Sequence, residues 1–444
     1  MKIKTKVENL LLFLLQFFIL LFFNFTKNFK IDEAISIYCS ENYFSDCINW
    51  DVQLPTFYFW LKISSNIFGF NLLVQKTIIA IIVSFSIFTI VKSIEILKSL
   101  SFFKKLLIST IISLIPLYYS SVWLRPYAFS LLFSSLSLFY FLKFLEERKK
   151  ELLLFSFIFD IIGTSFFYFN FILSLVKILY LGNKENLKFI SLYLLLLPFL
   201  LVNLKNLEVR KWSISWYESF SDYFYIFLLN FPIELFKNLT YTKLDFYFLI
   251  TSKFSQLILF LPFFTKNRFK FLYLYLFLFI LFLEIFFTTF NHYLILSRHF
   301  IPITNWILAL LIISLNNEFL ISFLVLPFVF YINHDILYIF SPSLEIVYFS
   351  ISQNSKILIH PFTLSSEIWY FEKIHKRNIT IYDDFPSSNF SCISTRKWDK
   401  NMILSKFEEI EIKLIKNDED YERICCKEKL FEIKIVNDKF VICK

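Results

Sequence analysis

Three acidic residues in the first polar stretch of the chain could take part in proton transfer. Asp32 and Glu33 stand side by side after a long apolar run, and Asp51 follows in the same polar stretch. A carboxylate held near an attacking hydroxyl can remove its proton and so make it a better nucleophile. The same acids would also be ordinary in a solvated loop, and Asp51 could equally cap a following helix.

Two arginines later in the chain could bind the other partner of such a reaction. Arg125 lies in "SSVWLRPYAFSLLF" and Arg298 in "NHYLILSRHFIP". A guanidinium group binds a phosphate through paired hydrogen bonds and offsets the negative charge that builds on a phosphate leaving group. Carboxylates and guanidinium groups on one face would therefore suit a phosphate-linked substrate. We interpret His292 and His299, which flank Arg298, as solvated or packed rather than catalytic.

The composition predicts a helical membrane protein with many spans. Of 444 residues, 57% are apolar, the mean hydropathy is +0.61, and apolar runs of spanning length recur along most of the chain. A soluble core of this size does not need such runs. The net charge of +9 is read as basic residues that flank membrane helices. Because no aromatic-basic module stands out, we expect no nucleic-acid partner.

Apolar runs predict eleven membrane helices, at residues 8–27, 70–91, 106–122, 127–145, 151–166, 168–182, 189–204, 246–264, 271–290, 301–316 and 319–339. The first run has no small-residue cleavage site, so we expect an uncleaved helix with a cytoplasmic N-terminus. This threading places most loop lysines and arginines inside, as the positive-inside rule requires, and the C-terminus outside. The expected location is the plasma (inner) membrane, with multiple passes.

Some segments fit this threading less regularly. Residues 56–70 are apolar but short and carry a lysine, so we interpret them as an interfacial helix on the outer leaflet. The helices at 151–166 and 168–182 form either a hairpin or one long helix. Asp160 and Glu284 lie within apolar runs, where an ionised carboxylate is costly, so each should face the bundle interior or an aqueous cavity. Neither has an evident partner in the sequence, and we interpret both as structural.

After residue 340 the long apolar runs give way to short alternating segments. "KILIH" and "NITIYDD" are typical of strands, with a helix between them in "SSEIWYFEKIHKR". "EIEIKLI" and "KLFEIKIVNDKFVIC" add further strands, the second a hairpin that turns at Asn437–Asp438. We therefore predict a transmembrane domain at 1–340, with its first outer loop at 28–69, and a small extracytoplasmic α/β domain at 341–444.

All six cysteines fall in segments that this threading places outside. An oxidising exterior would let Cys39 and Cys47 form a disulfide, although free thiols account for these residues equally well. The spacings match no zinc site well. We expect no cofactor and no metal, with a divalent ion at Asp32 or Asp51 as the open alternative.

Three stretches of the sequence resemble motifs of one family. "IDEAISIYC", "DVQLPTFYFW" and "LRPYAFSLLFSSLSLFYFL" are similar to the polyprenol-phosphate-sugar-dependent glycosyltransferases of the GT-C fold, especially the branch with the protein O-mannosyltransferases and the lipid A aminoarabinose transferase. In that family an Asp-Glu pair follows the first membrane helix, a His-Pro-Pro-Leu-Tyr-Tyr-like stretch opens the segment before the second, and an Arg-Pro-Tyr-Ala motif begins the fourth. The likeness runs from Lys2 to about Glu147, with an echo at "SRHFIP".

The resemblance implies roles for the matched residues. It implies that Asp32 is the catalytic base and that Glu33 helps to position donor or acceptor. The residues expected to bind substrate, or to support the site, are Asp51, Arg125, Tyr127 and Arg298. The sequence departs from the family at 53–56, where Gln-Leu-Pro-Thr replaces His-Pro-Pro-Leu, so no role for that histidine carries over.

The expected reaction is the inverting transfer of a sugar from a polyprenyl-phosphate donor to a protein, lipid or glycan acceptor on the extracytoplasmic face. A transporter or flippase of lipid-linked saccharides is the main alternative. Transporters usually show repeated halves and broken helices near the middle of the membrane, and neither signal is evident. An oligosaccharide polymerase or ligase would typically carry its largest loop late in the bundle, whereas the informative loop here comes first.

Overall fold

The computed structural model describes residues 2–25, 31–44, 47, 54–69, 71–114, 123–182, 188–189, 191, 193–194, 196, 262–263, 268–290, 301–314, 348–349, 353, 356–360, 370–372, 375–378, 380–383, 412–415, 429–435 and 438–443. For the strands, and for residues 2–5, 23–25, 31–32, 34, 114, 281 and 284–290, it describes the backbone only. The chain divides into two compact units. Unit 1 comprises Met1–Phe25, Val52–Phe57 and Leu72–Ile332, and unit 2 comprises Thr26–Asp51, Tyr58–Asn71 and Asn333–Lys444.

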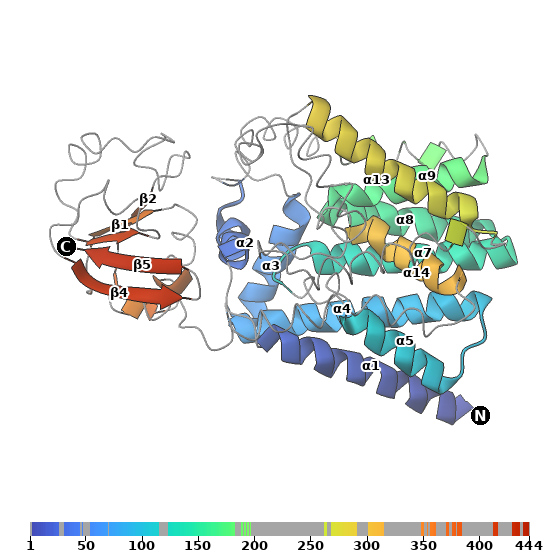
Figure 1. The fold of residues 1–444 in the computed structure, drawn as a ribbon, viewed down its shortest axis with the longest axis horizontal. Coiled ribbons are helices and arrows are strands. Elements are labelled where there is room, and N and C mark those ends of the chain that lie inside the picture. Colours follow the sequence, from blue (N-terminus) through green and yellow to red (C-terminus); the bar gives the residue numbers. More distant parts are fainter. Residues whose placement is uncertain are drawn as a thin grey trace, which may run out of the picture. The chain divides into compact units, whose positions relative to one another are not determined.

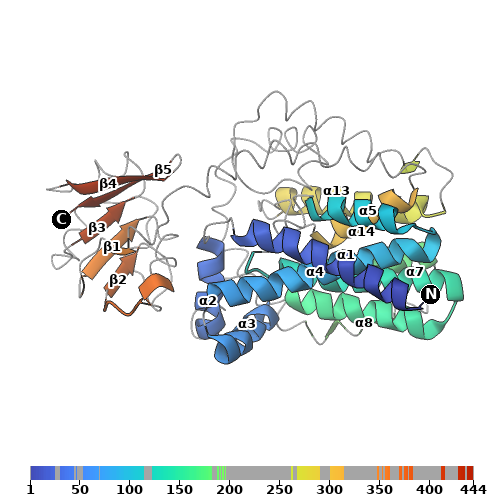
Figure 2. The same ribbon diagram turned by 90° about the horizontal axis from the view of Figure 1, so that it is seen from below.

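Unit 1 is a bundle of apolar helices. Its described elements are α1 (Lys2–Phe25), α4 (Leu72–Leu97), α5 (Phe102–Leu114), α7 (Tyr127–Glu147), α8 (Lys150–Phe166), the 3-10 turn η2 (Tyr168–Asn170), α9 (Phe171–Leu181), α13 (Lys270–Phe290) and α14 (Ile301–Ser314). Figures 1 and 2 show α1, α4, α7 and α8 running side by side. Of the described helices, α4 and α7 are both long and apolar enough to cross a membrane.

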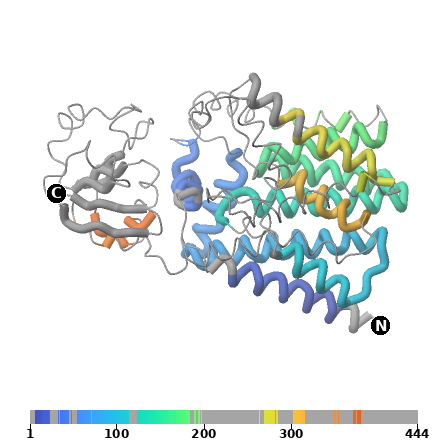
Figure 3. The backbone as a smooth tube through the Cα atoms, in the orientation of Figure 1, coloured from blue at the N-terminus to red at the C-terminus, as the bar shows by residue number. Residues whose placement is uncertain are grey.

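Helix α7 lies at the centre of unit 1. It packs against α4, α8 and α14, while α1 packs against α4 and α5. The backbone tube in Figure 3 shows α1 and α4, in two shades of blue, next to α5, in cyan. Nearly every residue of α14 is buried, as expected for a helix that is apolar all round. The core of the unit is therefore made of helix against helix.

The chain reverses direction between α8 and α9. Helix α8 ends at Phe166, Phe167 takes an extended conformation with φ −150° and ψ 110°, and η2 leads into α9. Side chains then pair across the turn, since Asp160 contacts Ser174 and Asn170 contacts the Gly163 carbonyl. These pairings are antiparallel, so the predicted hairpin is confirmed and the alternative of one long helix is wrong.

The described elements of unit 2 include the helices α2 and α3 and a sheet. Helix α2 spans Ile31–Asn42, and α3 spans Pro55–Phe68. The residues of α3 from Tyr58 onward belong to unit 2. The strands are β1 (Lys356–His360), β2 (Thr380–Asp383), β3 (Ile412–Ile415), β4 (Lys429–Ile435) and β5 (Asp438–Cys443), in the order β2-β1-β3-β5-β4. Strand β1 is parallel to β2 and β3, whereas β5 is antiparallel to β3 and β4.

The described helices coincide with most of the predicted apolar runs. The runs at 189–204, 246–264 and 319–339 lie wholly or largely outside the described residues. The number of eleven spans therefore stays a prediction, as does the interfacial position of α3. The strands fall within the segments that the alternating pattern marked, while the boundary at 341 and an independent α/β domain remain predictions.

Candidate functional site

The first two acids of the candidate site lie in a helix rather than in a loop. Asp32 and Glu33 occupy the first turn of α2, where negative charge interacts favourably with the helix dipole. The Glu33 side chain is fully buried, while the Asp32 side chain lies outside what the structure describes. The segment predicted as the first outer loop thus contains the helix α2, while its position outside the membrane stays a prediction.

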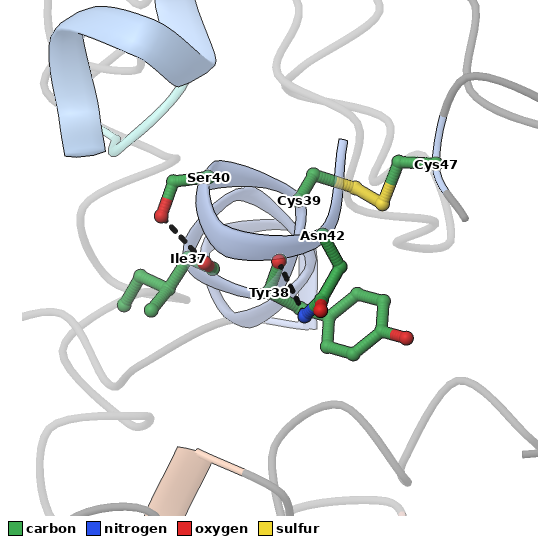
Figure 4. Close-up of a disulfide and its surroundings, with 6 residues drawn as sticks. All are labelled: Ile37, Tyr38, Cys39, Ser40, Asn42 and Cys47. Carbon is green, nitrogen blue, oxygen red and sulfur yellow. Dashed lines mark hydrogen bonds between the residues drawn. A yellow bond between two sulfur atoms is a disulfide. The ribbon is translucent and has the colours of Figure 1, made fainter. Parts of the chain in front are cut away.

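A disulfide closes the end of α2, as Figure 4 shows. Cys39, in the helix, is bonded to Cys47, the two Cα atoms are 5.6 Å apart, and both side chains are buried. The Ser40 hydroxyl donates to the Ile37 carbonyl at 2.6 Å, and the Asn42 amide donates to the Tyr38 carbonyl at 3.2 Å. Of the two readings of these cysteines, the disulfide is confirmed.

Aromatic contacts join the residues after α2 to α3 within unit 2. The rings of Tyr43 and Tyr58 have centroids 5.3 Å apart, and those of Phe44 and Phe59 are 5.5 Å apart. The Tyr58 side chain is fully buried. These aromatic pairs link the residues that follow α2 to α3, and the disulfide ties α2 to Cys47 in the segment between the two helices.

The arginine of the third motif lies at the start of α7, in unit 1. The Arg125 amide donates to the Trp123 carbonyl at 2.7 Å, and Pro126 is the N-cap of the helix with φ −64°. Proline suits this position because the first amides of a helix have no intrahelical acceptor. The side chains of Arg125 and Tyr127 are both buried, and the Tyr127 ring packs edge-on against Phe167 with centroids 5.6 Å apart.

A charged pair that the sequence did not reveal lies inside the same unit. The Lys177 ammonium is 2.6 Å from Asp160 Oδ2, and neither side chain is exposed. The expectation that Asp160 faces the interior or an aqueous cavity is confirmed in its first form, and the structure supplies the partner that is not evident in the sequence. The missed signal is a lysine within the apolar run at 168–182, which becomes a partner only when the hairpin folds back.

Hydroxyl groups surround this ion pair. Lys177 Nζ donates to Ser156 Oγ at 2.7 Å and to Ser137 Oγ at 3.1 Å. The Ser174 hydroxyl donates to Asp160 Oδ2 at 2.7 Å and lies 2.8 Å from the Tyr193 hydroxyl. Three helices, α7, α8 and α9, thus each supply polar side chains to one buried cluster.

The polar contacts continue along α7 toward the end that carries Arg125. Asn170 donates to the Ser130 hydroxyl at 2.8 Å. Asn305 donates to the hydroxyls of Ser134 and Ser135 at 2.7 and 2.9 Å. Small hydroxylated residues let helices approach closely and supply hydrogen bonds across the interface. We call Ser130, Ser134 and Ser135 the serine face of α7. Because the chain has only 3 glycines, these serines provide the close helix contacts that glycines often provide elsewhere.

The remaining predicted site residues lie outside the described residues. These are Asp51 and Arg298. His292 and His299, which we interpret as solvated or packed, also fall outside the described part of the chain. The Glu284 side chain is likewise outside them, although its backbone belongs to α13. Glu33 belongs to unit 2 and Arg125 to unit 1, so the convergence of acids and arginines on one face stays a prediction.

No group of three or more histidine, cysteine, aspartate or glutamate side chains that could hold a metal ion occurs within the described part of the chain. The expectation that no metal is used, and its alternative of a divalent ion at Asp32 or Asp51, are both left standing because the side chains of these two acids are not described. No protein-family model matches the sequence, and no curated protein matches it.

Proposed function

We propose that this chain is a membrane glycosyltransferase that moves a sugar from a polyprenyl-phosphate donor to an acceptor on the extracytoplasmic face. One observation carries the proposal: α1 ends at the same end of unit 1 at which α7 begins (Figures 1 and 2). Asp32 and Glu33 follow α1 in the chain, and Arg125 lies two residues before the first residue of α7. The motif residues that carry the resemblance thus follow or precede helix ends that lie at the same end of unit 1.

The opposite end of the same bundle carries basic residues, which supports the proposed orientation. Lys105 pairs with Glu95 where α4 leads into α5, and Arg268 pairs with Glu146 at the end of α7. Basic residues are retained on the cytoplasmic side of membrane proteins. The end with Arg125 would then face the exterior, where the buried Cys39–Cys47 disulfide is stable.

In the proposed reaction Asp32 takes a proton from the acceptor hydroxyl as its oxygen attacks the anomeric carbon of the donor. The bond from that carbon to the phosphate oxygen breaks, and polyprenyl phosphate leaves with the electron pair. Arg125 and Arg298 offset the charge on the departing phosphate. Glu33 positions donor or acceptor, with Asp51 and Tyr127 as further substrate contacts. The α/β domain would shape the acceptor side.

The proposal is tested by incubating the purified protein in detergent with a panel of polyprenyl-phosphate sugars and measuring release of polyprenyl phosphate. We expect release by the wild type and a loss of at least about 100-fold in Asp32→Asn, because general base catalysis contributes factors of this size. Glu41→Gln is the matched control, since Glu41 is an exposed acid near the other end of the same helix. Equal release by wild type and Asp32→Asn would refute the assigned base.

A flippase for lipid-linked saccharides is the second candidate, and the buried Asp160–Lys177 pair is the observation that favours it. Charged residues within membrane helices often mark transport pathways. Reconstitution into vesicles separates the two functions. If no donor is consumed but lipid-linked sugar crosses the bilayer, the transferase proposal is refuted in favour of the flippase.

A further inference from the structure

Lys177 lies in the middle of a helix that is otherwise apolar. Helix α9 has 11 residues and so measures about 17 Å, well short of a hydrocarbon core of about 30 Å. It therefore has little apolar surface with which to offset an ammonium group. A lysine at this place is costly unless another group of the protein compensates its charge.

Asp160 supplies that compensation from the antiparallel neighbour α8. Its carboxylate lies 2.6 Å from the Lys177 ammonium, and the rings of Phe157 and Trp306 lie 4.4 and 5.9 Å from the same nitrogen. Both charged side chains are completely buried. Asp160 Oδ1 has no hydrogen-bond partner among the described residues. Within the same residues, Lys177 is the one cation that pairs with this carboxylate.

The neighbouring hydroxyls bind the pair from both sides. Ser137 and Ser156 accept hydrogen bonds from the ammonium, and the Ser156 hydroxyl also donates to the Ser137 carbonyl at 2.8 Å. Ser174 donates to the carboxylate from the same face of α9 as Lys177. Contacts from α7, α8 and α9 thus hold both charges in one place, which a pair open to a moving solute would not require.

We propose that the Asp160–Lys177 pair is an electrostatic latch, that is, an ion pair that lets α8 and α9 pack into the bundle as one hairpin. Each charged side chain is tolerated in the buried position only when the other is present. The latch does not depend on the reaction that the protein catalyses. It explains how a short helix that packs against α8 and α13 can carry a lysine on its buried face. If the pair is a latch, it no longer favours the flippase, because the buried aspartate then has a structural role.

The test is a double-mutant cycle on the full chain, read as the yield of monodisperse protein extracted from membranes and as the thermal midpoint in detergent. Lys177→Met leaves the carboxylate alone, and Asp160→Asn leaves the ammonium alone. We expect each to lower the yield by about tenfold or more, because removing one partner leaves an uncompensated buried charge. The double variant removes both charges and should recover most of the yield.

Two comparisons keep the result interpretable. The exposed pair Glu146–Arg268 provides a matched cycle, in which Glu146→Gln and Arg268→Gln should leave yield and thermal midpoint close to those of the wild type. The latch is overturned if either single variant at Asp160 or Lys177 behaves like the wild type. It is also overturned if the double variant is as poor as the worse single variant, because the two charges would then not compensate each other.

Discussion

Ion pairs of nearly equal length occupy two very different places in unit 1. Asp160 and Lys177 are 2.6 Å apart and fully enclosed. Glu147 and Lys149 are 2.7 Å apart at the turn after α7, where the lysine side chain is 65% exposed. The hydrogen bond that Lys149 donates to the Glu147 carboxylate raises the pKa of Lys149, but water competes for both groups. The environment, rather than the distance, decides what each pair contributes.

The enclosed pair is a condition for folding, whereas the exposed pairs adjust the ends of helices. A charge that loses its partner in water is simply solvated, and one that loses its partner inside a bundle is not. The serine face of α7 belongs to the enclosed kind, although its members are neutral. Substitutions in the enclosed pair should therefore lower the free energy of unfolding measurably more than substitutions in the exposed pairs.

The largest effect is expected for Lys177→Met. It leaves the Asp160 carboxylate buried without its cation, so the free energy of unfolding should fall by about 3–5 kcal/mol. Denaturant unfolding in a mild detergent measures it. A fall of less than about 1 kcal/mol would place the enclosed pair with the exposed ones and remove the contrast.

A smaller loss is expected for Asn305→Ala, which tests whether neutral buried groups behave like the charged pair. The Asn305 amide donates to Ser134 and Ser135, and its removal should lower the free energy of unfolding by about 2 kcal/mol. Asn305→Asp serves as a comparison, because it adds a buried charge at the same volume and should be worse than alanine. If aspartate is tolerated better, this part of the bundle is more hydrated than its burial indicates.

Gly163→Ala probes how tightly the hairpin closes. A Cβ atom at Gly163 would come within 2.9 Å of Asn170 Cγ and Oδ1, displacing a side chain that donates to Ser130 and to the Phe167 carbonyl. We expect a loss of about 1–2 kcal/mol. The same change made together with Asn170→Ala should cost less than the sum of the two, since the clash is then relieved. Strict additivity would contradict the close approach.

The smallest effect is expected for Arg268→Gln. Arg268 pairs with Glu146, and the two side chains are 55% and 39% exposed. Exposed pairs typically contribute less than about 1 kcal/mol and are weakened by salt. Unfolding measured at low and high ionic strength should therefore show a small difference from the wild type that shrinks with salt. A loss as large as that for Lys177→Met would mean that exposure does not separate the two places.

Much of the helical architecture was predictable because apolar runs of spanning length have few other solutions. The run at 127–145 became α7, and the run at 271–290 became α13. Helix α2 was not predicted, because it is short, mixed in polarity and lies in a stretch that we interpreted as loop. Its helical form is supported by contacts outside the segment, including the disulfide to Cys47, which local pattern does not contain.

The candidate site shows the same division. The motif with Arg125 was visible in the sequence, and the structure places it at the first turn of α7. The partner of Asp160 was not visible, because 17 residues and a chain reversal separate it from Lys177. The sequence of the run at 168–182 does not predict that its lysine lies on the side of α9 that packs against α8.

The order of residues by itself determined where apolar helices form and which polar residues follow their ends, because hydrophobic burial and backbone hydrogen bonding act within each segment. Only the tertiary structure decided which charges meet. An ion pair inside a bundle depends on the turn at Phe167 and on the packing of three helices, and these contacts join residues that are distant in the chain.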